Sequence, residues 1–88
     1  MADKELERLL RGGSDANFRF ESLRRILRTA GFSERIKGSH HVYSRTGVEE
    51  IINLQSLPNG KAKVYQVKQV RGILTRYRLV SDDKAHEV

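Results

Sequence analysis

Residues 37–43 read Lys37-Gly38-Ser39-His40-His41-Val42-Tyr43, and the fold is built on the hairpin that they predict. Gly38-Ser39 is a two-residue hairpin turn of the Gly-X kind. It joins two expected strands, over 32–37 and 40–45. Because side chains alternate along a strand, His40 and His41 point to opposite faces of the hairpin. The sequence therefore predicts two neighbouring histidines beside the turn, with their imidazole rings on opposite faces of the hairpin.

Two amphipathic helices and a third strand flank this hairpin. Apolar residues recur at helical spacing from Arg19 to Ala30 and again from Val64 to Arg78. Between them, alternation predicts a third strand over 48–55, which Pro58-Asn59-Gly60 ends. Gly72 inside the last helix costs about 1 kcal/mol relative to alanine, so a close packing contact is predicted there.

The segment before the first long helix predicts a short helix of its own. Residues 3–11 have one apolar stripe, with Asp3 as the cap and Gly12-Gly13 as the stop. Nine residues are marginal for an isolated helix, so this one must dock on the rest of the chain or fray. Asn17 is the best nearby capping side chain for the helix that follows, and a cap one or two residues later is the alternative.

The order of elements predicts one α+β domain. Its three-stranded antiparallel sheet has the two longer helices on one face, and its other face is left to solvent. Glu34 is an irregularity, because it falls on the apolar set of the first strand. Residues 1–16 are expected to form an N-terminal extension with the short helix, 17–80 the main domain, and 81–88 a disordered tail.

Composition and charge narrow the function classes. The chain has 88 residues, no cysteine and a net charge of +6, and it shows neither a membrane-length apolar run nor a secretory signal. These features predict a cytoplasmic protein without disulfides or thiolate metal sites. Residues 16–80 carry 13 cations and four acids, hence +9. Such a basic body indicates a nucleic-acid binder, although a merely soluble basic surface is also possible, and a membrane-binding face is not evident.

From about Phe18 to Leu79 the chain resembles the HicA (YcfA-like) toxins, the ribonuclease half of HicA–HicB toxin–antitoxin pairs. The resemblance depends on four stretches taken together and in this order. They are Thr29-Ala30-Gly31-Phe32, then Lys37-Gly38-Ser39-His40-His41-Val42-Tyr43, then Ile52-Asn53-Leu54-Gln55, and finally the run from Gly60 to Arg71, GKAKVYQVKQVR.

The resemblance implies a fold, an activity and a partner. The family's fold is similar to the double-stranded-RNA-binding domain, α-β-β-β-α, to which this chain adds the short N-terminal helix. The implied activity is that of a metal-independent mRNA interferase without a cofactor, which is neutralised by a HicB-like antitoxin protein. We expect a monomer when the toxin is free and a hetero-oligomer with the antitoxin. The family's catalytic histidine falls on His40, and its second histidine falls on His41.

The chemistry expected of His40 is general-base catalysis on RNA. A neutral imidazole can accept the proton of the ribose 2′-OH, which then attacks the adjacent phosphorus. Tyr43 either stacks a base or packs on the sheet. The alternative to a catalytic His40 is a residue that only orders the turn. Two histidines on opposite faces, with no third ligand, predict no metal site. The residues predicted to contact RNA are Arg24, Arg28, Arg35, Lys37, Gly38, Ser39, His41, Tyr43 and Arg45.

Two further function classes stay open. Familiar members of the family have Pro-His-Pro in the third strand, where this chain has Asn53-Leu54-Gln55. The missing histidine is compatible with an RNA-binding domain that does not cleave. A protein-interaction domain, whose basic face serves an acidic partner, would instead bind RNA weakly and without a steep salt dependence.

Overall fold

The computed structural model describes residues 3–79 of the chain. Its elements follow the predicted α+β order, with three helices, a three-stranded antiparallel sheet and one additional 3₁₀ turn. In chain order they are α1 (Lys4–Arg11), η1 (Asp15–Asn17), α2 (Phe20–Thr29), β1 (Ser33–Lys37), β2 (His40–Ser44), β3 (Ile52–Leu54) and α3 (Val64–Arg76). The tail predicted over 81–88 lies outside the described residues.

The hairpin prediction is confirmed. β2 is the central strand and pairs antiparallel with both β1 and β3. Lys37 lies opposite His40, which leaves Gly38 and Ser39 as the two turn residues. Gly38 has φ +61°, whereas Ser39 is not among the residues with positive φ. Positive φ at the first turn position alone is the type II′ combination, which matches the twist of the strands it joins.

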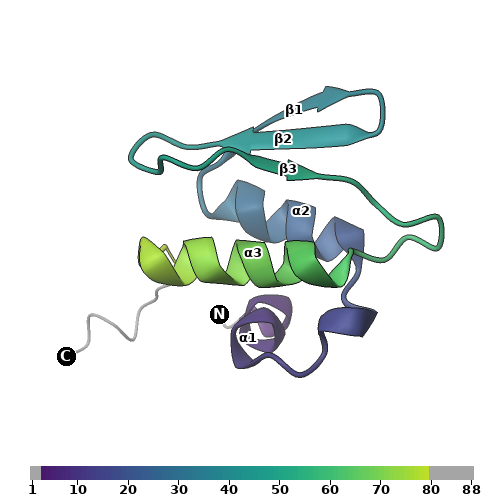
Figure 1. Cartoon of the computed structure of the whole chain (residues 1–88). Coiled ribbons are helices and arrows are strands. Elements are labelled where there is room, and N and C mark those ends of the chain that lie inside the picture. Colours follow the sequence, from purple (N-terminus) through teal and green to yellow (C-terminus); the bar gives the residue numbers. More distant parts are fainter. Residues whose placement is uncertain (1–2, 80–88) are drawn as a thin grey trace.

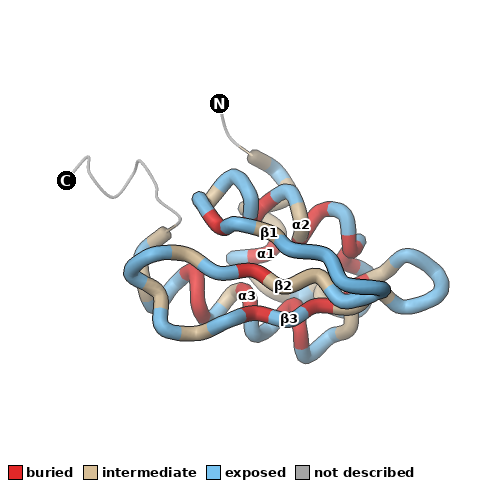
Figure 2. Tube along the Cα trace, turned by 90° about the horizontal axis from the view of Figure 1, so that it is seen from above, coloured by how far each residue is buried: buried red, intermediate tan, exposed pale blue. Residues whose placement is uncertain are grey.

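The molecule has three layers (Figure 1). The sheet is the first, α2 and α3 lie side by side beneath it as the second, and α1 with η1 forms the third. One face of the sheet therefore packs on helices and the other faces solvent, as predicted. Figure 2 looks onto the sheet, where buried segments occur in β2 and β3 and the edge strand β1 is largely exposed. Side chains buried in the core include Leu23, Leu27, Tyr43, Ile52, Leu54, Val70 and Leu74.

The N-terminal helix docks on the rest of the molecule. Asp3 caps it as predicted, because its Oδ1 accepts from the backbone N–H groups of Glu5 (3.0 Å) and Leu6 (3.2 Å). Leu9 is fully buried, which stabilises the docked state by about 1.5–3 kcal/mol. From α3, the Arg71 guanidinium donates to the Leu9 carbonyl oxygen and to both carboxylate oxygens of Asp15.

The third strand is shorter than predicted. It covers Ile52–Leu54 instead of 48–55, because other partners bind the residues before it. Val48 packs on the core and its N–H donates to the Arg45 carbonyl oxygen in a turn. The Glu50 carboxylate accepts from the Tyr77 hydroxyl (2.7 Å) and pairs with Arg76. These contacts keep Val48 in the turn after β2 and bind Glu50 to the end of α3, so neither pairs with β2 as a strand residue.

Two local predictions are wrong. Asn17 does not cap α2, since its side chain accepts from Lys61 Nζ. The cap position is Arg19, two residues later, and the N–H of Phe20 donates to the Gly60 carbonyl oxygen. Gly72 makes no close packing contact, because a Cβ built there would have nothing within 4 Å. The loop before α3 thus supplies the cap that the sequence assigned to a side chain.

Candidate active site on the open sheet face

The solvent-facing side of the sheet carries three cross-strand rows of side chains. Lys37 lies opposite His40 at the hairpin end, and Ser33 lies opposite Ser44 at the other end. The middle row is Arg35, Val42 and Asn53. No residue of these rows is an acid. We call this surface the open face; it is basic and polar, with Val42 as its one apolar member.

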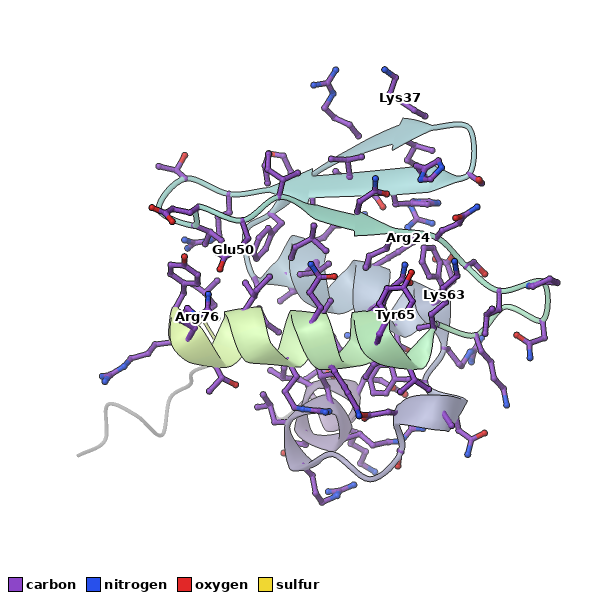
Figure 3. The ribbon with its side chains drawn as sticks, viewed as in Figure 1. Arg24, Lys37, Glu50, Lys63, Tyr65 and Arg76 are labelled. Carbon is purple, nitrogen blue, oxygen red and sulfur yellow. The ribbon has the colours of Figure 1, made fainter. Side chains whose placement is uncertain are left out.

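His40 is exposed on the open face, and one neighbour orients its ring. Its Nδ1 lies 3.2 Å from the side-chain oxygen of Asn53 on β3. An amide oxygen can only accept, so this contact requires a proton on Nδ1 and leaves Nε2 as the nitrogen with a free lone pair. The ring is therefore set up to accept a proton through Nε2. Lys37 extends from the same end of the sheet, away from the helices (Figure 3).

The turn beside His40 is fixed to β3 as well. The Gln55 side-chain nitrogen donates to Ser39 Oγ at 3.0 Å, just past the end of β3. Gln55 is in turn held near Gln66 of α3. Two contacts, one to the ring of His40 and one to the turn, thus fix the hairpin end against the neighbouring strand. Such support from a rigid scaffold is what positions a catalytic side chain.

His41 points the other way, toward the helices. Its side chain is only 15% exposed, and its Nδ1 lies 3.2 Å from Glu34 Oε2. The ring meets Phe20 edge-on, with 5.0 Å between ring centroids and 73° between planes. His41, which was predicted to contact RNA, therefore lies in the packing between β2 and α2 and not on the open face.

Glu34 explains why an acid occupies the apolar side of β1. It faces the helices and accepts two hydrogen bonds from Arg24 (2.8 and 3.1 Å) and one from the Tyr43 hydroxyl (2.5 Å), beside the contact to His41. Arg24 above all, then Tyr43 and His41, lower the pKa of Glu34 from 4.5 to about 2. Burial and then the Glu34 carboxylate raise the pKa of Tyr43. Figure 3 shows Arg24 at the sheet–helix boundary.

This network removes two more residues from the predicted RNA contacts. Tyr43 is fully buried, so it cannot stack on a base, and of its two alternatives packing on the sheet is correct. Arg24 is committed to Glu34 and Glu21, and these pairings raise its pKa further. Neither side chain is available to a phosphate on the open face.

The remaining predicted contacts lie in three places. Arg45 is at the far end of β2 from His40, where its Nε donates to the Ala30 carbonyl oxygen and its Nη1 to that of Thr46. Arg28 belongs to α2, on the opposite side of the sheet from the open face, in a hollow that it shares with Arg19, Glu21 and Arg25. The other predicted contacts are on the open face: Lys37, Gly38 and Ser39 lie beside His40 at the hairpin end, and Arg35 lies in the middle row.

Sequence reasoning missed two side chains that organise the site, Asn53 and Glu34. The alternation of β3 contained a signal for Asn53, because the residue between Ile52 and Leu54 must face outward, as His40 does. For Glu34 the signal was its presence on the apolar set of β1, since a buried carboxylate requires partners. Which partners it has depends on α2, and no local pattern reveals that.

Comparison with known proteins identifies no relative: no family model, no curated protein and no solved structure matches the chain. Among residues 3–79, no helix is both long and apolar enough to cross a membrane. The same residues contain no group of three histidine, cysteine, aspartate or glutamate side chains placed to hold a metal ion. Inferences about function therefore depend on the open face itself.

Proposed function

We propose that this protein is an endoribonuclease toxin of the HicA kind, with a fold like that of the double-stranded-RNA-binding domain. It cleaves mRNA without a metal ion, using His40 as its single catalytic histidine, and a HicB-type antitoxin neutralises it in the cytoplasm. One observation carries the proposal. The exposed imidazole of His40 has its Nδ1 hydrogen-bonded to Asn53 and its Nε2 free. The cross-strand rows of the open face around it contain basic side chains and no acidic ones.

The proposed reaction uses the RNA's own hydroxyl as nucleophile. His40 Nε2 accepts the proton of a ribose 2′-OH, and the O2′ oxygen forms a bond to the adjacent phosphorus. The bond from phosphorus to the 5′ oxygen of the next nucleotide breaks, and that oxygen takes a proton from water. The products are a 2′,3′-cyclic phosphate and a 5′-OH end. This reaction requires no oxidant, metal ion or cofactor.

The hairpin end supplies groups for the developing charge. Lys37 lies opposite His40 in the strand register, and Gly38 with Ser39 forms the turn between them. The ammonium and the backbone N–H groups of the turn are the nearest donors for the additional charge on the phosphoryl oxygens. A positioned general base contributes about 10²–10⁴-fold, so the rest of the acceleration must come from these donors and from alignment of the RNA.

The first test replaces the proposed base. We expect His40→Ala and His40→Gln to abolish cleavage of an RNA substrate by the purified protein, because no other described imidazole faces the open side. Both variants should melt as the wild type does, since the His40 ring is exposed. Cleavage by either variant at the wild-type rate would refute the assignment.

RNA binding and RNA cleavage by the wild type separate the alternative functions. A non-catalytic RNA-binding domain would bind RNA tightly in the wild type and cleave none. A protein-interaction domain would bind RNA weakly, with a shallow dependence on salt. For the enzyme, a HicB-like protein should block access to His40, so that chemical modification of that ring is fast in the free protein and slow in the complex.

A further inference from the structure

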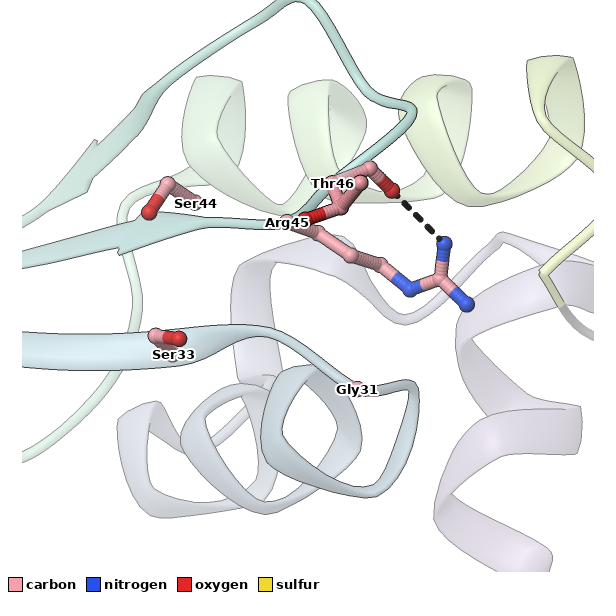
Figure 4. A pocket seen from close by; sticks show the side chains of 5 residues that line it. All are labelled: Gly31, Ser33, Ser44, Arg45 and Thr46. Atoms are coloured by element: carbon pink, nitrogen blue, oxygen red, sulfur yellow. Dashed lines mark hydrogen bonds between the residues drawn. The ribbon is translucent and has the colours of Figure 1, made fainter.

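An open hollow of about 570 Å³ lies at the end of the sheet away from His40 (Figure 4). Five residues line it: Gly31, Ser33, Ser44, Arg45 and Thr46. Ser33 and Ser44 are the cross-strand pair that forms the last row of the open face. The hollow is therefore continuous with the surface that carries His40, and none of its lining residues is acidic.

We infer that this hollow is a second phosphate-binding site for the same RNA strand. A single-stranded RNA would lie along the open face, with the cleaved bond at His40 and a more distant phosphate between Ser33, Ser44 and Arg45. The inference depends on the proposed function for the nature of the ligand. Beyond that function, the inference specifies that the RNA is single-stranded and that it runs along the open face. It also specifies the length that a substrate needs to reach full affinity.

The lining has the chemistry of a phosphate site. Ser33, Ser44 and Thr46 contribute hydroxyl groups, and no hydrogen bond from these three hydroxyls to any residue among 3–79 is present. Arg45 has five N–H donors, of which two bind carbonyl oxygens, so three are left for a ligand. Hydroxyls and a guanidinium are typical phosphate contacts in nucleic-acid complexes.

Arg45 is held in place by hydrogen bonds but without a carboxylate partner among residues 3–79. Within the described chain, Arg8, Arg24, Arg25, Arg71 and Arg76 are each paired with a carboxylate. Arg45 is held only by the carbonyl oxygens of Ala30 and Thr46, and no described acid pairs with it. It is therefore ordered in advance while its positive charge remains without an anionic partner, which favours binding of an anion.

Gly31 makes this arrangement possible. It has φ +96°, and a Cβ built on it would lie 2.9 Å from Arg45 Nε. The arginine stem thus crosses directly over the glycine, where any side chain would displace it. Figure 4 shows the guanidinium extending past Gly31, with its hydrogen bond to Thr46. The end of α2 is shaped to admit Arg45.

The spacing between the two sites fits one RNA strand. Ser44 follows His40 by four residues in β2, which corresponds to about 13 Å along a strand. A nucleic-acid strand advances about 3.4 Å per nucleotide when stacked and roughly twice that when extended. The two sites are therefore about two to four nucleotides apart. Arg35 lies in the row between them, so a single strand running from His40 to the hollow would pass a cation midway.

The experiment measures affinity against length. Fluorescence anisotropy would report binding of 2′-O-methyl oligonucleotides, which cannot be cleaved, from two to eight nucleotides long and extended on either side of one fixed step. For the wild type we expect a gain in affinity once the oligonucleotide spans the two sites, from extension on one side only. Ser33→Ala combined with Ser44→Ala should weaken binding of the octanucleotide about 10-fold and leave the dinucleotide unchanged.

Two further variants sharpen the result. Ser44→Glu should remove the length-dependent gain, because a carboxylate in the hollow repels the phosphate. Thr75→Ala, which removes an exposed hydroxyl from α3, should leave every affinity unchanged. Equal affinities of the wild type and the serine double variant at all lengths, or no gain with length in the wild type, would overturn the second site.

The readout is independent of cleavage. If His40→Ala still cleaves RNA, the proposed catalytic role fails while the dependence of binding on length and on Ser33 and Ser44 still decides the second site. If the second site is wrong and the catalytic role right, cleavage will depend on His40 while the serine double variant shows the wild-type KM on long substrates.

Discussion

The orientation of His40 depends on a single amide. Asn53 Oδ1 faces His40 Nδ1 at 3.2 Å and thereby selects the ring nitrogen that is left to act as base. We expect Asn53→Ala to lower kcat about 10-fold with little change in KM, because the ring can then rotate and exchange its proton between nitrogens. Cleavage rates of a short RNA over a range of pH would measure this.

The same position offers a matched variant. Asn53→Asp retains an acceptor for Nδ1–H, so it should restore most of kcat. Its negative charge also favours the imidazolium, so the acidic limb of the pH–rate profile should move to higher pH. Asn53 does not orient the base if the alanine variant retains the wild-type kcat and pH profile.

Glu34 is the residue that most clearly makes the stability of the fold depend on pH. Its pKa is lowered from 4.5 to about 2, chiefly by Arg24, and its side chain is 12% exposed. A carboxylate with a lowered folded-state pKa stabilises the fold above its unfolded pKa, and this contribution is lost as pH falls from about 4.5 to about 2. Glu34→Gln should therefore cost about 3 kcal/mol at pH 7 and much less at pH 2.

Denaturant unfolding at the two pH values checks this expectation. Glu21→Gln is the matched control, because Glu21 pairs with the same Arg24 but is 68% exposed. That substitution should change the free energy of unfolding by less than about 1 kcal/mol. A Glu34 variant as stable as the wild type at pH 7 would mean that the network adds nothing net to stability.

At the scale of single residues, alternation predicted more than residue type did. Strand alternation alone predicted that His40 and His41 point to opposite faces of the sheet, as they do. The roles of His41 and Tyr43 could not be read locally, because Glu34 and Phe20 come from other elements and bury them. A basic or aromatic side chain near a motif is thus a weak sign of RNA contact.

Among the elements, α3 contains a substitution site that should stabilise the protein. Gly72 is exposed, lies in the interior of the helix and leaves space for a Cβ. Because alanine loses less conformational entropy than glycine when a helix forms, Gly72→Ala should raise the free energy of unfolding by about 0.5–1 kcal/mol. Thermal melting would show this as a higher Tm.

A second glycine gives the opposite expectation. Gly31→Ala places a side chain at φ +96° and 2.9 Å from Arg45 Nε, so it should lower Tm. A decrease in Tm for Gly72→Ala would indicate that the helix bends or packs at that point in a way that the static contacts do not reveal.

Element types were predictable and their ends were not. The three helices follow from apolar spacing, and β1 and β2 follow from the glycine turn between them. The first half of the predicted third strand does not form, because Glu50 binds Tyr77 and Arg76 at the end of α3, much later in the chain. The cap of α2 comes from Gly60 for the same reason. Contacts between distant segments set these ends.

For the whole molecule, the distribution of charge sets how binding responds to salt. Arg35, Lys37 and Arg45 are the cations along the proposed path, and each contributes about −0.7 to the slope of log affinity against log salt for a single strand. We expect a slope of about −2 for a non-cleavable octanucleotide. Arg35→Gln should make it shallower by about 0.7, as measured by anisotropy from low to moderate salt.

Lys68→Gln is the control for position. Lys68 is exposed on α3 and lies near Asp15 in the third layer, away from the open face. This variant loses the same formal charge as Arg35→Gln, so a general charge effect would change both slopes equally. An equal change would indicate that RNA does not follow the open face.

Composition and element order established the overall architecture, an α+β domain with one covered and one open sheet face. They did not show that the fold divides its charges, with most ion pairs among the helices and unpaired cations on the sheet. That division arises because Glu34 points inward while its neighbour Arg35 points outward, and the partners that secure Glu34 come from α2 and β2.

The position of α1 also offers a way to handle the protein. This helix lies beneath α2 and α3, on the opposite side of the molecule from the open face (Figure 1). Glu7 is exposed there, and the chain contains no cysteine. Glu7→Cys would create a single thiol, through which the protein could be tethered to a sensor surface with its sheet directed toward the bulk solution.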